Sequence, residues 1–249
     1  MNALKSKKAL WLLALPTALV AVAFGLFIAV PNHTVPVAEP VDQYVYLGQG
    51  WGDEAQSADR QTYYFTGQGT SLPQGDARRA LRYDWFVNLE MPLGQARFAD
   101  PQHMRAYRFI VDAKPTPANP DHLPVGFARH YSETLGTDVL DITCAACHTG
   151  QLHYTRDNTR YAIRVDGGQA MHAFTDVSRG SFGTTLLASL TATWINPAKF
   201  NRFAARVLGE DAAARKSELH DQLGQTLRAF AGSGQNNPFR HLYPTREGY

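Results

Sequence analysis

The feature that most constrains this chain is the run Thr143-Cys144-Ala145-Ala146-Cys147-His148. A Cys-x-x-Cys-His run is the signature of covalent haem attachment, because two thiols must reach the two vinyl groups of one porphyrin while the adjacent imidazole reaches its iron. If Thr143 caps the start of a helix, Cys144, Cys147 and His148 are i, i+3 and i+4 neighbours that share one face. We therefore predict one covalent haem c per chain, held by Cys144 and Cys147, with His148 as the metal ligand.

Three other uses of paired cysteines are disfavoured. A structural zinc site normally takes four Cys or His ligands, and the 2 cysteines of this chain are both in the motif. A thioredoxin-like redox pair follows a βαβ pattern, which the neighbouring residues do not show. A plain disulfide between Cys144 and Cys147 is the third alternative.

The second axial ligand of the iron decides the chemistry, because a Met or His there favours electron transfer whereas an open position permits oxygen or peroxide to bind. Methionine is commonly core filler, and a lone histidine is commonly a surface residue. The sequence leaves this ligand unassigned among Met91, Met104, His122, His130, His153, Met171 and His172.

The amino-terminus predicts a membrane anchor. Residues 1–8 form a basic flank, and Ala9 to Val30 is an uncharged stretch of 22 residues, long enough to cross a bilayer as a helix. The basic flank stays in the cytoplasm, so everything after Pro31 lies outside. We predict a single-pass anchor in the inner, cytoplasmic membrane with the haem domain in the periplasm. The alternative is a signal peptide cleaved after Ala21-Val22-Ala23, which would leave a soluble periplasmic protein.

Local patterns divide the remainder. Residues 31–43 contain Pro31, Pro36 and Pro40 and are predicted to be an extended linker, and 44–249 the haem domain. Five prolines between residues 97 and 140 predict long irregular stretches. A strand is predicted at 161–165, and helices at 53–65, 76–89, 169–177, 196–208 and 211–231. The net charge of +2 and the absence of a basic stripe beyond the short run 78–82 argue against a nucleic-acid partner.

Five motifs occur in one order along the chain: Tyr46-Leu47-Gly48-Gln49-Gly50-Trp51, Tyr83-Asp84-Trp85-Phe86, Leu123-Pro124-Val125-Gly126-Phe127, Ile142-Thr143-Cys144-Ala145-Ala146-Cys147-His148-Thr149-Gly150 and Arg164-Val165-Asp166-Gly167-Gly168. Over residues 44–249 the chain resembles the amino-terminal half of the dihaem cytochrome c peroxidase superfamily, in particular its rubber-oxygenase-like branch. In this resemblance Cys144 and Cys147 match the thioether positions and His148 the proximal ligand. Arg164 lies near the place of a residue that pairs with a haem propionate, its alternative being an ordinary surface arginine.

We predict a mainly α fold, in which the N-terminal transmembrane helix is followed by a cytochrome-c-like haem domain with long irregular loops. The resemblance implies the mostly helical, cytochrome-c-like character of this domain. It also implies a second Cys-x-x-Cys-His downstream, and this chain has one. We therefore expect either a fragment truncated at its carboxy-terminus or a single-haem relative. The predicted function is the haem module of a peroxidase-like or oxygenase-like oxidoreductase, with a redox partner protein in the periplasm or membrane. The alternative is a membrane-tethered single-haem electron carrier.

Overall fold

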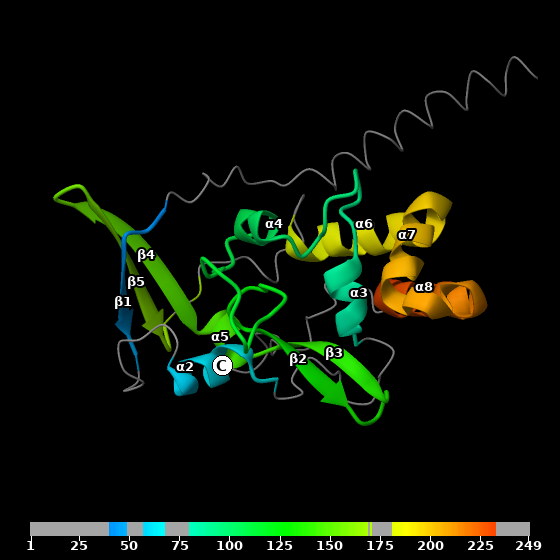
Figure 1. Ribbon diagram of the computed structural model, residues 1–249, viewed down its shortest axis with the longest axis horizontal. Helices are drawn as coiled ribbons and strands as arrows, with labels where there is room; N and C mark the ends of the chain where they lie inside the picture. The colour runs from blue at the N-terminus through cyan, green and yellow to red at the C-terminus, as the bar shows by residue number, and fades with distance from the viewer. Residues whose placement is uncertain (1–39, 49–56, 68–79, 169, 171–180, 233–249) are drawn as a thin grey trace, which may run out of the picture.

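The computed structural model describes residues 40–48, 57–67, 80–168, 170 and 181–232 (Figure 1). The basic flank, the predicted anchor at 9–30 and all of the predicted helix at 169–177 except residue 170 lie outside these residues. Within the described ranges, no helix combines the length and the apolar character needed to cross a membrane.

Five strands form two separate sheets. Strands β1 (Gln43–Leu47), β5 (Thr159–Asp166) and β4 (Thr149–Arg156) make a three-stranded sheet in that order. In this sheet β1 runs parallel to β5, and β4 runs antiparallel to it. The other sheet is an antiparallel hairpin of β2 (Phe127–Ser132) and β3 (Thr137–Ile142).

The helices fall into two groups (Figure 1). The short helices α2 (Ala58–Phe65) and α5 (Cys144–Cys147) lie between the two sheets, whereas α6 (Phe182–Ile195), α7 (Pro197–Leu208), the 3-10 turn η2 (Gly209–Asp211) and α8 (Ala212–Gly232) pack together at the other side. Two further short helices, α3 (Tyr83–Asn88) and α4 (Pro101–Ala106), lie beside this second group, and α3 contacts both β3 and α7. The predicted start of α7 is confirmed: the Asn196 side chain accepts hydrogen bonds from the backbone of Ala198 and Lys199, with Pro197 in the first turn.

The prediction of a mainly α domain is wrong. Two sheets flank the cysteine motif in sequence, since β3 ends two residues before α5 and β4 begins two residues after it. The predicted strand at 161–165 is confirmed as part of β5. Strands β2 and β3 lie where proline-rich irregular chain was expected, and the mostly exposed β4 carries no buried stripe to reveal it. Its hydrogen-bonding partner, and not its own pattern, makes this segment a strand.

The main core is aromatic. Phe182, the first residue of α6, lies 5.2 Å from the ring of Phe109 and 5.8 Å from that of Phe127 on β2. The rings of Phe86 and Phe98 join the same cluster at 5.8 Å from one another. Burial of these side chains ties the helical group to the hairpin that leads into the cysteine motif.

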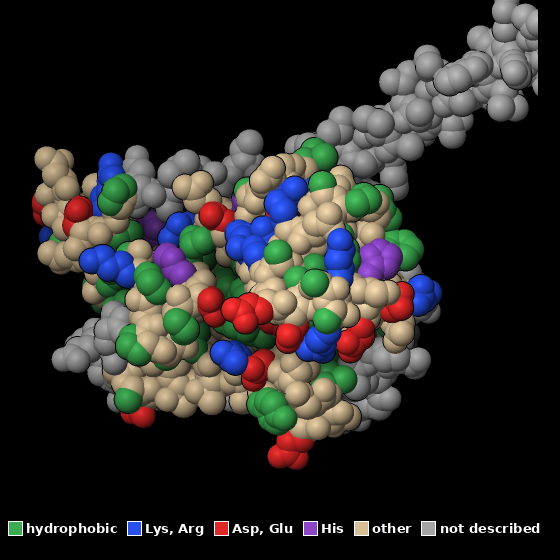
Figure 2. Space-filling view, turned by 45° about the vertical axis from the view of Figure 1, so that its right-hand side comes forward, with side chains coloured by type: hydrophobic (Ala, Val, Ile, Leu, Met, Phe, Trp, Pro, Cys, Tyr) green, Lys and Arg blue, Asp and Glu red, His purple; other side chains and the backbone are tan. Residues whose placement is uncertain are grey.

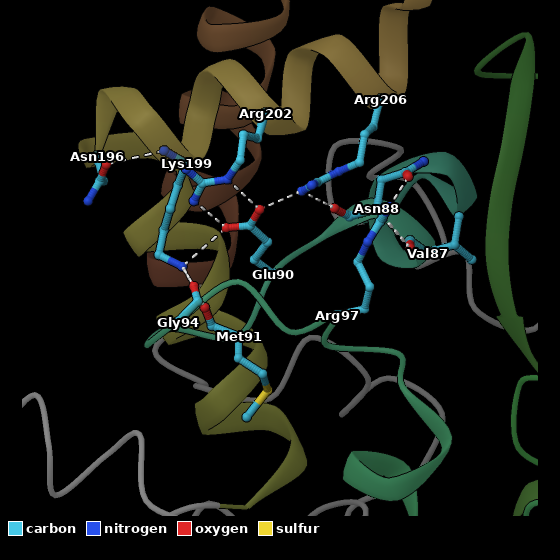
Figure 3. Close-up of polar contacts among 10 residues, drawn as sticks. All are labelled: Val87, Asn88, Glu90, Met91, Gly94, Arg97, Asn196, Lys199, Arg202 and Arg206. Carbon is cyan, nitrogen blue, oxygen red and sulfur yellow. Dashed lines mark hydrogen bonds and ion pairs between the residues drawn. The ribbon is translucent and has the colours of Figure 1, made fainter.

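One buried carboxylate ties α7 to the segment after α3 (Figure 3). Glu90 is 2% exposed, and its two oxygens accept from Nε and Nη2 of Arg202 at 2.8 and 2.7 Å. Arg206 Nη2 donates at 2.9 Å, and Lys199 Nζ lies 3.4 Å away. The hydrogen bond from Arg202, against the cost of burial, holds the pKa of Glu90 down to about 2. Arg202 and Arg206, two cations of one helix, therefore keep this carboxylate ionised.

The molecular face drawn in Figure 2 carries charges of both signs close together. Acidic and basic side chains lie side by side near its centre, with hydrophobic and uncharged polar groups between them. On this face, side chains of opposite charge thus lie close enough together to offset one another.

Candidate haem attachment site

The cysteine motif forms the single turn α5, with Thr143 at its N-cap position as predicted. Ala145 and Ala146 are 1% and 3% exposed, whereas Cys144 and His148 are exposed and Cys147 is half-buried. The backbone N–H of His148 donates to the Cys144 carbonyl at 2.9 Å, which closes the turn. Cys144 and His148 are therefore accessible, whereas Cys147 packs in part against the main core. That both thiols and the imidazole share one face stays a prediction.

A close approach of two backbones fixes the buried side of α5. Gly126 has φ +88°, and a Cβ at this position would lie 2.1 Å from the backbone nitrogen of Ala146. Its own N–H donates to the Tyr64 carbonyl, and its carbonyl accepts from the N–H of Thr143 at 2.8 Å. Glycine is required here by both conformation and space. The segment 123–127 therefore packs against the buried side of α5.

The two ends of the turn are attached to α2 and β5. At the start, the Thr143 hydroxyl lies 3.4 Å from the carbonyl oxygens of Tyr63 and Tyr64 instead of capping the helix. At the end, the His148 carbonyl accepts from the Tyr63 hydroxyl at 3.1 Å and from the Gly167 N–H at 2.7 Å. The backbone of His148 is thus fixed while its imidazole stays exposed.

A buried ion pair lies where α2 meets β5. Arg60 Nε donates to Asp166 Oδ2 at 3.0 Å, and both side chains are 0% exposed. The Tyr64 hydroxyl donates to the other carboxylate oxygen at 2.5 Å. Burial raises the pKa of Tyr64 well above its usual value, so this hydroxyl stays protonated and donating. Asp166 is paired in register with Thr149, which is the residue directly after His148. The ion pair therefore lies beside the motif.

Arg164 is buried, so it is no ordinary surface arginine. It is 1% exposed; Nη1 donates to Asp112 Oδ1 at 2.6 Å, and Nε donates to Gln151 Oε1 at 2.9 Å. Burial alone would lower its pKa, but the Asp112 carboxylate and the Tyr64 hydroxyl outweigh burial and raise it. Among the described residues, buried Nη2 has no hydrogen-bond partner. A propionate at Arg164 would have to use Nη2 or replace Asp112, and this pairing stays a prediction.

The candidates for the second axial ligand are dispersed. Met104 is 0% exposed within the core, Met91 packs against the same core, and His130 is half-buried on β2. His122 Nε2 lies 2.8 Å from the Asp112 carbonyl oxygen, and His153 is exposed on β4. Met171 and His172 lie outside the described residues. The ligand stays unassigned.

No disulfide joins Cys144 and Cys147 in the structure. In the part of the chain that the structure describes, no three His, Cys, Asp or Glu side chains gather as a metal-binding group. Two cysteines and an imidazole within five residues, with Cys144 and His148 exposed and Cys147 half-buried, fit a haem c, which needs two thioether bonds and one axial imidazole from this segment.

The supporting residues were missed by sequence reasoning. Arg60, Tyr63 and Tyr64 come from a helix about eighty residues before the motif, and only the fold brings them to it. Gly126 and Asp166 lie within segments that carry the family resemblance, so the sequence did mark them, without giving their roles.

Comparison with known proteins finds one relevant relative. The chain is 29% identical over 235 residues to uncharacterized protein y4iJ of Sinorhizobium fredii, a match covering 84% of this chain and 34% of that protein. The chain therefore spans about a third of the length of the curated relative that it matches. No family model matches the sequence. No solved structure matches it either.

Proposed function

We propose that this chain binds one haem c covalently through Cys144 and Cys147, with His148 as an axial ligand. One observation carries the proposal: Cys144 and His148 are exposed and Cys147 is half-buried on a single turn whose two alanines are buried. Contacts of Gly126 and Tyr63 position the backbone of this turn. Such preorganisation is what a covalent cofactor site requires.

The test is attachment itself. In a host with haem c maturation, the purified full chain should keep haem through denaturing electrophoresis and give a c-type pyridine haemochrome. The double variant Cys144→Ser/Cys147→Ser should lose covalent haem, and His148→Ala should retain attached haem with altered iron ligation. His103→Ala, at a histidine of α4 that is none of the candidates for the second axial ligand, is the control and should change neither property. A b-type spectrum, or haem released by acid extraction, would contradict the proposal.

The reaction follows from what the bound group can do. A haem c supplies one-electron transfer and, with an open axial position, reaction with peroxide or dioxygen. We assign the chain to the haem module of a peroxidase-like or oxygenase-like oxidoreductase that works with a redox partner protein. The resemblance over residues 44–249 supports this assignment, since it covers the segments that contain Gly126 and Asp166.

A membrane-tethered electron carrier is the second candidate. It is favoured by the single Cys-x-x-Cys-His run among the 249 residues, because a carrier needs only one haem. Spectra of the reduced protein with and without carbon monoxide separate the two. Rapid carbon monoxide binding with peroxide turnover supports the enzyme, whereas a six-coordinate haem that ignores carbon monoxide supports the carrier.

The proposed location is the inner membrane, with Ala9 to Val30 as a single-pass anchor and the haem domain in the periplasm. Support comes from the uncharged stretch and its preceding lysines. The mass of the mature amino-terminus tests it. A chain that starts beyond Ala23 has been cleaved, and would be soluble in the periplasm.

A further inference from the structure

The three-stranded sheet buries charged side chains of β5 and leaves apolar ones partly exposed. Along β5 the buried positions include Arg164 and Asp166, whose side chains face α2. Tyr161, Ile163 and Val165 alternate with them and remain partly exposed on the opposite face. Successive side chains of a strand point to opposite faces. The apolar side of this strand therefore faces away from the described core.

The neighbouring strands extend the same face. In register, Leu152 of β4 and Val45 of β1 lie either side of Ile163, and Tyr154 pairs with Tyr161 with their rings stacked at 4.8 Å. Leu152 is 59% exposed and Tyr154 is 43% exposed. We call this surface the outer sheet face; it consists of Val45, Leu47, Leu152, Tyr154, Tyr161, Ile163 and Val165. Gln43 and Arg156 lie on the same face at its edges, so its centre is an apolar surface of the kind that marks a contact.

The outer sheet face is too small to hold two copies of the chain together. Strands lie about 4.8 Å apart and rise about 3.3 Å per residue, so three strands of five to eight residues cover roughly 350 Å². A stable dimer buries about 800 Å² on each partner. A small apolar surface is sufficient, however, where a tether already keeps its target close.

The chain provides such a tether. The first described strand, β1, begins at Gln43, after residues 31–42 have followed the apolar stretch 9–30. These intervening residues span at most about 40 Å when fully extended. The sheet therefore lies within reach of any bilayer that holds residues 9–30. Tyrosine beside aliphatic residues is also the composition found at the membrane–water boundary.

We infer that the outer sheet face rests on the lipid surface of the membrane in which the chain is anchored. This inference depends on the proposed anchor, and it adds an orientation: the sheet lies flat on the bilayer. Arg156, at the hairpin end of β4, falls on the same face two residues beyond Tyr154 and reaches lipid headgroups. The contact rests mainly on apolar side chains, with Arg156 as a charged group at its edge, so salt should weaken it only in part.

Photo-crosslinking from the full chain tests this contact. A benzophenone amino acid is placed at Leu152, with Tyr131 of the β2–β3 hairpin as matched control, because the two are 59% and 60% exposed on strands of different sheets. The chain is reconstituted in nanodiscs of phosphatidylethanolamine and phosphatidylglycerol. After irradiation, mass spectrometry should find several-fold more lipid adduct at position 152 than at 131, a difference that persists when the salt concentration is raised.

Each other product contradicts the inference. An adduct within the chain means that another segment covers the face, an adduct between chains means self-association, and equal lipid adducts at 152 and 131 mean no orientation. Hydroxyl-radical footprinting of the unsubstituted chain checks that the label causes no artefact: Tyr154 should be protected in nanodiscs and Tyr131 should not. The amino-terminal mass is read from the same sample, so loss of the anchor is distinguished from failure of the contact.

Discussion

Two buried carboxylates, Asp166 and Glu90, are neutralised in different ways. Asp166 has Arg60 as its ion-pair partner, and both side chains are 0% exposed. Glu90 is shared by three cations, of which the side chains of Arg202 and Arg206 are 34% and 24% exposed. The difference lies in what happens when the carboxylate is removed. The partly exposed side chains of Arg202 and Arg206 can turn to water, whereas the buried side chain of Arg60 cannot. Removing each carboxylate should therefore lower the free energy of unfolding by a different amount and should affect the cysteine motif differently.

Asp166→Asn should produce the largest loss of stability. It removes the buried carboxylate that accepts from Arg60 Nε and from the Tyr64 hydroxyl, at a cost of about 3–5 kcal/mol in the free energy of unfolding. Urea unfolding measures this loss. The control Asp157→Asn, at a side chain that is 89% exposed, should change stability by less than about 0.5 kcal/mol. Because Asp166 lies beside the motif, the yield of covalent haem should fall as well.

Glu90→Gln should lower the free energy of unfolding by about 3 kcal/mol. This loss is smaller than that of Asp166→Asn because Arg202 and Arg206 are partly exposed to solvent. Its distinguishing result is that the folded fraction should attach haem normally, since these contacts join α7 to the segment after α3. Glu218→Gln, an exposed i,i+3 partner of Arg215 on α8, is the control and should have little effect. Equal loss of haem attachment in the Glu90 and Asp166 variants would remove the distinction between the two sites.

Acid should abolish the contribution of Glu90. The folded pKa of about 2 lies below the ordinary value of 4.5, so the stabilisation is fully present above pH 4.5 and is lost as the pH falls towards 2. The shift corresponds to about 3 kcal/mol at neutral pH. The difference in unfolding free energy between wild type and Glu90→Gln should stay constant from pH 7 to about 5 and vanish near pH 2. A difference that persists at pH 2 would show that packing, and not charge, makes the Glu90 carboxylate important.

The contrast also shows what the sequence could reveal. The cysteine motif was readable because its reactive groups lie within five consecutive residues, and the start of α7 because Asn196 and Pro197 act on their own helix. The burial of Arg60 depends on α2 meeting β5 about a hundred residues later, and no local pattern encodes that contact.

The strands show the same limit. Alternation in residues 161–165 revealed β5, but it did not reveal which face would be buried, because burying Arg164 requires Asp112 and Gln151 to be in place. The exposed β4 is a strand because β5 pairs with it. The prediction of a mainly α domain failed because the segments around the motif become strands by pairing with other segments, and not through a pattern of their own.

The smallest effect is expected at Tyr64. Tyr64→Phe removes the hydroxyl that donates to Asp166 Oδ1 but leaves the Arg60 ion pair and the buried ring, so it should cost about 1 kcal/mol. The control Tyr154→Phe, on the exposed outer sheet face, should be close to neutral. Combining Tyr64→Phe with Asp166→Asn completes a double-mutant cycle measured by urea unfolding. If the ion pair dominates, the double variant should lose little more than Asp166→Asn alone, because the hydroxyl no longer has a carboxylate to bind. Fully additive losses would mean that Tyr64 stabilises the site independently of Asp166.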